Sequence, residues 1–262
     1  STQRFNEGSW SAYYNPDDCY TSYYNGIYAA HDYLDKSVDY RYILGMHRDT
    51  LTSNGLDSYR RDIVDVQRLR AEAHVLKAYY YFELAKRYGG VPLIERVYAD
   101  QKEANLPRGT FDEVVGLILR EIEGVRNEVV VDWRAENLEE KSGRITRGAA
   151  LALKSRVLLY AASPQFNPSG EKSKWAAAAA AAFEVINMGI YSLHPDYGGL
   201  FVAETSTTSP ETIWAVRMGA TNEFERKNYP IGTQGGGTGI CPSQNLVEAY
   251  ESTGEDTGDA YA

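Results

Sequence analysis

The sequence is poor in cysteine and histidine and has no long hydrophobic run. Only 2 cysteines and 4 histidines occur in 262 residues, and they form neither C-x-x-C nor H-E-x-x-H spacing. Cys19 and Cys241 lie far apart, and their spacing does not show whether they pair. No run of about 18 apolar residues could cross a membrane as a helix. We therefore predict no metal and no cofactor, with structural or surface roles for the histidines.

Motifs of catalysis are also missing. There is no G-x-S-x-G elbow, and the glycine-rich segment Gly232–Gly239 lacks the G-K-[ST] of a phosphate loop. Carboxylate pairs such as Glu139 and Glu140 occur, but 36 acidic residues make such pairs expected by chance. A glycosidase needs two carboxylates positioned in a cleft, and nothing singles out two. We predict no catalytic residue and no enzyme activity.

Positive charge is in deficit, whereas tyrosine is abundant. The 27 Lys and Arg face 36 Asp and Glu, for a net charge of −9, which argues against binding nucleic acid or anionic lipid. The chain has 21 tyrosines. Tyrosine combines a flat apolar ring with a polar tip, which suits wet binding surfaces and the two faces of a sugar. We expect most of these rings to pack between helices.

Leu69–Ile94 contains the strongest helical pattern. Its apolar residues are spaced three or four positions apart, so they share one helix face. They are Leu69, Ala73, Leu76, Tyr80, Leu84 and Tyr88. The predicted opposite face carries Arg70, Glu72, Lys77, Glu83 and Arg87. Tyr79–Phe82 are consecutive aromatics that cover nearly the whole circumference, so we expect burial between neighbouring helices. Gly89-Gly90 and Pro92 predict the helix end.

Other segments predict further helices. Asn15 before Pro16 fits an N-cap, Thr110 and Glu113 fit a capping box, and Ser173 fits another cap. The predicted helices are about 16–37, 65–88, 111–127, 146–162, 174–188 and 243–251.

Between these helices we predict connecting structure. Residues 38 to about 62 show little period and predict a loop, after which the central helix begins near Asp62 or Asp65. Thr212–Met218 alternates weakly and predicts one short strand. Glu223–Gly239 predicts a long, mobile, glycine-rich loop.

Several of these segments resemble the SusD/RagB family of nutrient-binding outer-membrane lipoproteins. LRAEAHVLKAYYYFELAKRYGGVPL resembles the family's signature helix, and GRITRGAALALKSRVLLYAASP and PSQNLVEAYE resemble later family segments in the same order. His31-Asp32 stands where Ala-Asn is common. The resemblance implies a mostly α, tetratricopeptide-like helical scaffold with long loops and little strand, as a single region over residues 1–262. Family members normally continue for roughly as long again, so we expect the family's C-terminal half to be lacking.

The resemblance also implies a role. It implies non-catalytic binding of a glycan or other nutrient at the bacterial cell surface, with delivery to a SusC-like, TonB-dependent outer-membrane transporter. The protein would be lipid-anchored, although no signal peptide or anchor cysteine lies near Ser1, which reads as the start of a processed or trimmed segment. Family sites fall on loops that here contain Trp10, Asn228, Tyr229 and Gln234. Tyr229 is the first choice, because a ring in a Gly- and Pro-rich loop has little reason to be core.

Two other classes stay open at this point. A helical-repeat protein-protein interaction module would show a broad apolar surface face and no aromatic platform of sugar size. A glycan-degrading enzyme would need a cleft holding two carboxylates about 5–10 Å apart.

Overall fold

The computed structural model describes residues 8, 11, 13–98, 100, 103, 105–133, 143–202, 209–216, 221–237 and 243–250. Its contacts divide the chain into two compact units. The larger unit is Asp18–Val216, and the smaller combines Ser1–Asp17 with Arg217–Ala262. The single region predicted over residues 1–262 stays a prediction, since the contacts define these two units separately.

The protein is mostly helical, as predicted. The larger unit contains α2 (Tyr20–Lys36), α3 (Tyr40–His47), α4 (Ser53–Tyr88), α5 (Phe111–Val125), α6 (Arg147–Ala162), α7 (Lys172–Ile186) and the 3-10 turn η2 (Gly199–Phe201). The smaller unit contains α9 (Glu223–Asn228) and α10 (Gln244–Glu248). In the described ranges β-pairing is limited to isolated bridges.

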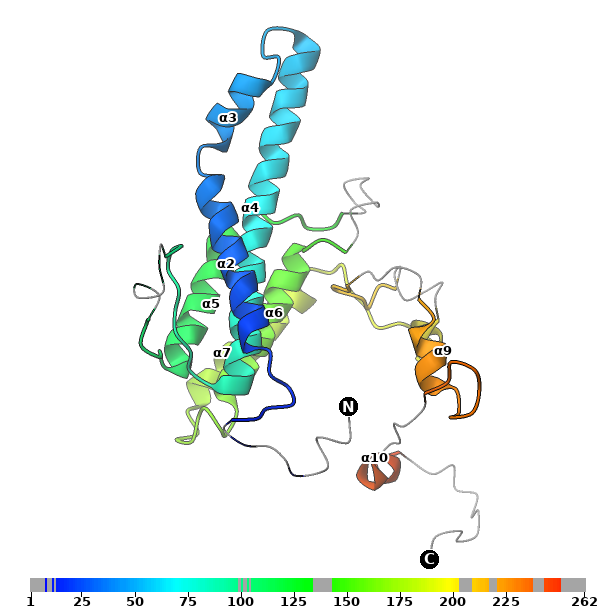
Figure 1. Ribbon diagram of the computed structural model, residues 1–262. Coiled ribbons are helices and arrows are strands. Elements are labelled where there is room, and N and C mark those ends of the chain that lie inside the picture. The colour runs from blue at the N-terminus through cyan, green and yellow to red at the C-terminus, as the bar shows by residue number, and fades with distance from the viewer. Residues whose placement is uncertain are drawn as a thin grey trace, which may run out of the picture. The chain divides into compact units, whose positions relative to one another are not determined.

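The long helix α4 is the centre of the larger unit (Figure 1). It packs against α2, α5 and α6, while α5 packs on α6 and α6 on α7. From α4 to α7 each helix therefore packs on the next one along the chain, which agrees with the helical-repeat scaffold implied by the resemblance. Among the described helices, α3 lies beside the upper part of α4 (Figure 1).

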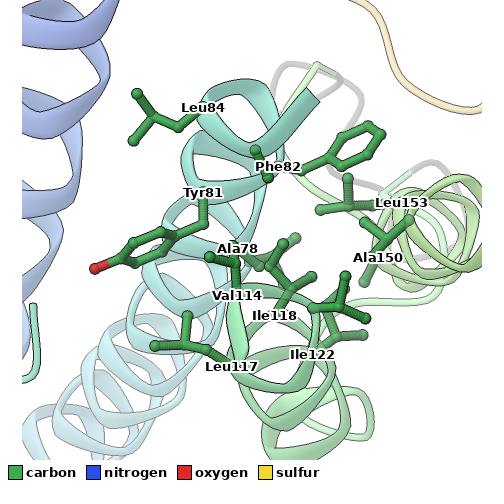
Figure 2. Close-up of a cluster of buried hydrophobic side chains, with 14 of the residues drawn as sticks. Ala78, Tyr81, Phe82, Leu84, Val114, Leu117, Ile118, Ile122, Ala150 and Leu153 are labelled. Carbon is green, nitrogen blue, oxygen red and sulfur yellow. The ribbon is translucent and has the colours of Figure 1, made fainter. Parts of the chain in front are cut away.

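The core forms where α4 meets α5 and α6. Tyr81 and Phe82 point to opposite sides of α4, and Ile118 and Ala150 approach from α5 and α6 (Figure 2). All four side chains are buried. Small side chains such as Ala78 allow the helices to approach closely. The predicted burial between neighbours is confirmed for Tyr81 and Phe82, whereas Tyr79 and Tyr80 are half-buried against the core.

The predicted division of α4 into one apolar and one polar face is wrong. Leu69 is 42% exposed, whereas the charged residues Glu72, Lys77 and Glu83 are buried. Because α4 has neighbours on several sides, part of its charged face is enclosed. Each enclosed charge has an opposite partner, as burial requires. Lys77 pairs with Glu121 at 2.9 Å, and Arg144 pairs with Glu72.

The helix starts at the N-terminal end also differ from prediction. Residues 38–62, predicted as a loop, contain α3 and the first residues of α4, whose N-cap is Thr52. No residue of α3 is buried, so this region lacks the apolar period from which a helix is recognised. The first helix begins at Tyr20 and not at Pro16. Asn15 instead accepts a hydrogen bond from the Asp17 amide at 2.9 Å, in a local turn.

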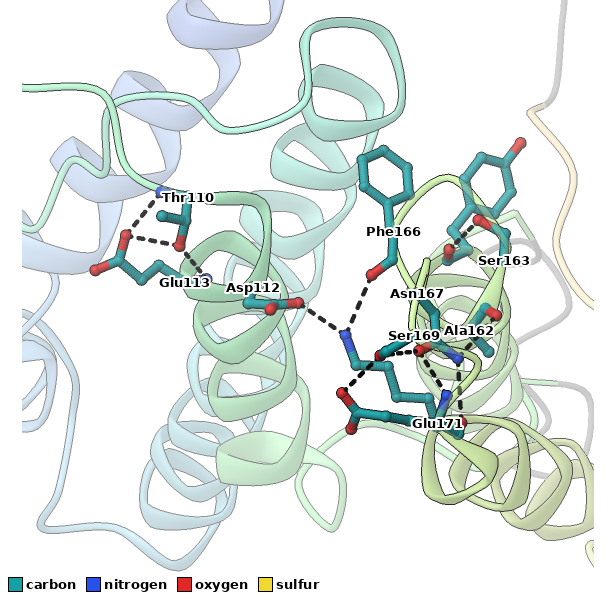
Figure 3. A network of polar contacts seen from close by, with 11 residues as sticks. Thr110, Asp112, Glu113, Ala162, Ser163, Phe166, Asn167, Ser169 and Glu171 are labelled. Carbon is teal, nitrogen blue, oxygen red and sulfur yellow. Dashed lines mark hydrogen bonds and ion pairs between the residues drawn. The ribbon is translucent and has the colours of Figure 1, made fainter.

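Capping signals were more informative at α5 than at α7 (Figure 3). Thr110 and Glu113 form the predicted capping box, with the Thr110 amide donating to Glu113 Oε2 at 2.7 Å. α7 begins before Ser173, and its N-cap is Glu171. Asn167 holds this start by accepting from the Glu171 amide at 2.9 Å (Figure 3). The bond fixes the residue before the helix, and Ser173 lies inside α7 and not at its N-cap.

The C-terminal segments differ from prediction in two places. The described residues 212–216 form no strand, and Trp214 instead packs on the core and donates from Nε1 to the Gly143 carbonyl at 3.0 Å. The segment predicted as a loop from Glu223 begins with α9. The predicted last helix is present as α10, capped by Ser243.

The predicted end of α4 is also confirmed, because Gly89 has a positive φ of 72°.

Candidate functional site

Two of the four predicted binding residues lie at the C-terminal end of α9. Asn228 is the last residue of this helix and Tyr229 follows it directly. The Tyr229 amide donates to the Glu225 carbonyl at 2.8 Å, which fixes the backbone from which the ring projects. Glu223 and Lys227 pair at 2.8 Å on the same helix, and that hydrogen bond lowers the pKa of the Glu223 carboxyl.

Residues 229–237, here named the α9 loop, fold back on this helix. The Gly237 amide donates to the Arg226 carbonyl at 2.8 Å, and the Thr233 amide donates to the Pro230 carbonyl at 3.1 Å. A Cβ on Gly236 would lie 2.5 Å from the Pro230 carbonyl oxygen. Only glycine fits there, so the glycine-rich composition builds a compact turn against α9.

The α9 loop brings three of the four predicted residues into one local structure. Asn228, Tyr229 and Gln234 are all exposed. The exposed fraction of Tyr229 is 49%. Trp10 lies outside the described residues. Exposed amides next to a ring can hydrogen-bond the edge of a hydroxylated ligand while the ring covers its apolar face.

Sequence reasoning missed Ile231 in this loop. It is 80% exposed and adds apolar surface two residues after Tyr229. The signal that selected Tyr229, an apolar side chain in a Gly- and Pro-rich segment, applies equally to Ile231.

The aromatic residues of α4 serve packing. Tyr79 contacts Trp214 edge to face at 5.6 Å between ring centroids, and Tyr80 lies 6.0 Å from Tyr23. Tyr23 donates to Glu83 at 3.2 Å, and burial together with the Glu83 charge raises the pKa of Tyr23 to about 12. These rings have partners within the larger unit, which supports the interpretation of α4 as a central packing helix.

Histidines and membrane-spanning features add no further candidate. His31 Nε2 lies 2.9 Å from the Ile94 carbonyl oxygen and His74 Nδ1 lies 2.6 Å from Glu121 Oε2, as expected for structural roles. Among the described residues no group of three or more His, Cys, Asp or Glu could hold a metal ion. No helix in the described ranges is both long and apolar enough to span a bilayer.

A family comparison identifies the scaffold. A SusD-like family, described as starch-binding and associating with the outer membrane, matches residues 1–159. This chain belongs to the SusD-like family. The signature helix α4 lies within the matched segment, whereas PSQNLVEAYE lies outside it. A comparison with curated proteins gave no match.

Solved structures of SusD-like proteins share the fold. A SusD-like protein from Bacteroides fragilis is 25% identical with a TM-score of 0.58, covering 78% of this chain and 34% of that one. A SusD homolog from Bacteroides thetaiotaomicron is 25% identical with a TM-score of 0.54, covering 69% and 31%. A laminarin binding SusD-like protein is 22% identical with a TM-score of 0.53, covering 74% and 36%. The SusD-like chain described here therefore spans about a third of the length of these relatives.

Proposed function

We propose that this SusD-like chain binds a glycan or other nutrient at the bacterial cell surface without transforming it. The bound cargo would pass to a SusC-like, TonB-dependent transporter in the outer membrane, where a lipid anchor would hold the protein. Membership in a family described as starch-binding and outer-membrane-associated supports this proposal. The exposure of Tyr229, Asn228 and Gln234 on α9 and the α9 loop is the structural observation that carries it.

The α9 loop suits weak and reversible capture. The Tyr229 ring would stack on the C–H face of a sugar, while Asn228 and Gln234 would bind its hydroxyl groups. Trp10 would add a second ring. Such exposed sites keep much of their water, so the expected affinity is millimolar to micromolar, about −4 to −8 kcal/mol.

Calorimetry against a panel of polysaccharides tests the site. Tyr229→Ala should weaken binding by about tenfold, because it removes the stacking ring, while Tyr229→Phe should retain most of the affinity. Tyr28→Ala is the matched control, since Tyr28 lies on α2 and is 48% exposed against 49% for Tyr229. Unchanged binding by Tyr229→Ala would remove Tyr229 from the site.

A second assay tests the non-catalytic part of the proposal. The protein is incubated with each polysaccharide that it binds, and reducing ends are measured over time. We expect no release above the level of a protein-free control. A steady release that depends on protein concentration would contradict the proposal and favour a glycan-degrading enzyme.

One observation favours the alternative of a helical-repeat interaction module. The apolar side chains Trp175, Phe183 and Ile186 of α7 are exposed on the larger unit, and exposed apolar faces mark protein contacts. Failure to bind any glycan, together with binding to a co-expressed transporter that Phe183→Lys abolishes, would favour this alternative.

A further inference from the structure

A cleft between α4 and α5 has a chemistry that the proposed glycan site does not use. Its volume is about 350 Å³, which lies at the lower end of the range for small-molecule sites, about 300–1,000 Å³. The polar and glycine residues that line it are Arg70 and His74 from α4, Arg120, Glu121 and Gly124 from α5, and Glu128 just beyond α5. The cleft lies wholly within the larger unit and has room for one sugar-sized molecule.

The carboxylate of Glu121 is already engaged inside the cleft. Its Oε1 lies 2.9 Å from Lys77 Nζ and its Oε2 lies 2.6 Å from His74 Nδ1. Burial opposes ionisation of Glu121, but the hydrogen bonds from His74 and Lys77 outweigh it and lower the pKa of the carboxyl. The negative charge of Glu121 is therefore compensated by Lys77. The contact between His74 Nδ1 and Glu121 Oε2 orients the His74 ring at the cleft.

Two arginines in the cleft have no carboxylate partner within the described ranges. Arg70 donates from Nη1 to two neutral acceptors, the Leu34 carbonyl at 2.6 Å and the Ser37 hydroxyl. Arg120 is exposed at the cleft and makes no ion pair with a described residue. Both guanidinium groups thus retain positive charge that no carboxylate among the described residues neutralises.

The local charge balance is opposite to that of the chain. Arg70, Lys77 and Arg120 supply three positive charges, while Glu121 and Glu128 supply two negative ones. The cleft is therefore net positive by one charge even with His74 neutral, although the whole chain carries −9. Glu128 opposes an anion, but its carboxylate also accepts hydrogen bonds from hydroxyl groups.

We propose that this cleft binds a small carboxylic acid that also carries hydroxyl groups, the chemistry of a sugar acid. The ligand carboxylate would pair with Arg120, because a guanidinium presents a planar pair of donors that matches a carboxylate. Arg70 would add a second positive charge. The ligand hydroxyl groups would bind Glu128 and His74. This site is separate from the α9 loop and does not rest on glycan binding there.

Titration with galacturonate and with galactose, at one fixed ionic strength, tests the proposal. These two probes differ by one carboxylate, so we expect galacturonate to bind at least about tenfold more tightly. Arg120→Gln should remove that preference. Arg61→Gln is the charge-matched control, because Arg61 is exposed on α4 and does not line the cleft.

Gly124→Met provides a second variant that blocks the cleft by volume. A Cβ at Gly124 meets no atom within 4 Å, and Met favours a helix more than Gly does, so the variant should keep its circular dichroism spectrum. We expect it to lose galacturonate binding.

Three results would overturn the assignment: no galacturonate binding by the wild type, equal binding of both probes, or unchanged binding by folded Gly124→Met. Tyr229→Ala separates this site from the proposed glycan site. It should leave galacturonate binding unchanged, and a loss of that binding would place the acid at the α9 loop instead and would also overturn the assignment.

Discussion

At the scale of single residues, burial separates two phenylalanines of similar sequence context. Phe82 of α4 is 0% exposed and contacts Tyr160 edge to face at 5.1 Å, whereas Phe183 of α7 is 59% exposed. Phe82→Ala should reduce the free energy of unfolding by about 3–5 kcal/mol, because it leaves a cavity in the core. Phe183→Ala should change it by less than about 0.5 kcal/mol. Urea denaturation followed by circular dichroism measures both, and an equal loss in the two variants would contradict the difference in burial.

The buried charges of α4 could not be predicted at this scale. The sequence places Glu72 and Lys77 on a polar helix face, and helix periodicity assigns such a face to solvent. Lys77 is nevertheless buried, because Glu121 of α5 lies opposite it. A partner more than forty positions away leaves no local pattern. The cleft that Glu121 lines was therefore not predictable from the sequence.

At the scale of elements, α2 approaches α4 closely where Gly26 meets Tyr80. A Cβ on Gly26 would lie 2.6 Å from the Tyr80 ring. Gly26→Ala should therefore be destabilising by about 1–3 kcal/mol through overpacking, despite the gain in helix propensity. Adding Tyr80→Leu should recover part of that loss. Gly124→Ala in α5 is the control, since it has open space and should stabilise by about 0.5–1 kcal/mol. A stabilised Gly26→Ala would show that the helices can separate at no cost.

Local signals determined which elements were predictable. The start of α5 follows from Thr110 and Glu113, and the end of α6 from Ser163 and Pro164, because caps and prolines act within one helical turn. α3 was missed, since it buries nothing and so has no apolar period. The α9 loop was located by composition alone, whereas the helix before it was not anticipated. Its six residues are too few for a periodic pattern.

At the scale of the whole larger unit, ion pairs join the packed helices in addition to apolar contacts. Lys154 of α6 contacts Glu123 of α5 at 2.6 Å and Glu184 of α7 at 2.7 Å. Arg126 contacts the same two carboxylates at 2.9 and 3.0 Å. Burial opposes ionisation of Glu123, yet the hydrogen bonds from Lys154 and Arg126 lower its pKa. The pKa of Glu121 is lowered in the same way. A carboxyl whose pKa is lower in the folded state stabilises the fold above its unfolded value and loses that contribution as the pH falls.

Acid should therefore destabilise the larger unit in two stages. Burial, with the charge of Lys77, lowers the pKa of His31 below its ordinary value of 6.5. Below about pH 6.5 His31 is therefore protonated in the unfolded chain but still neutral in the folded one. The free energy of unfolding should fall as the pH drops below that value. The carboxylates should add a second fall below about 4.5, which is their ordinary pKa. The free energy of unfolding, measured in urea between pH 7.5 and about pH 3.5, tests both stages.

His31→Gln should flatten the first stage and leave the second, because glutamine cannot take up the proton. Identical slopes for the variant and the wild type between about pH 6.5 and 5 would show that His31 does not control the first stage.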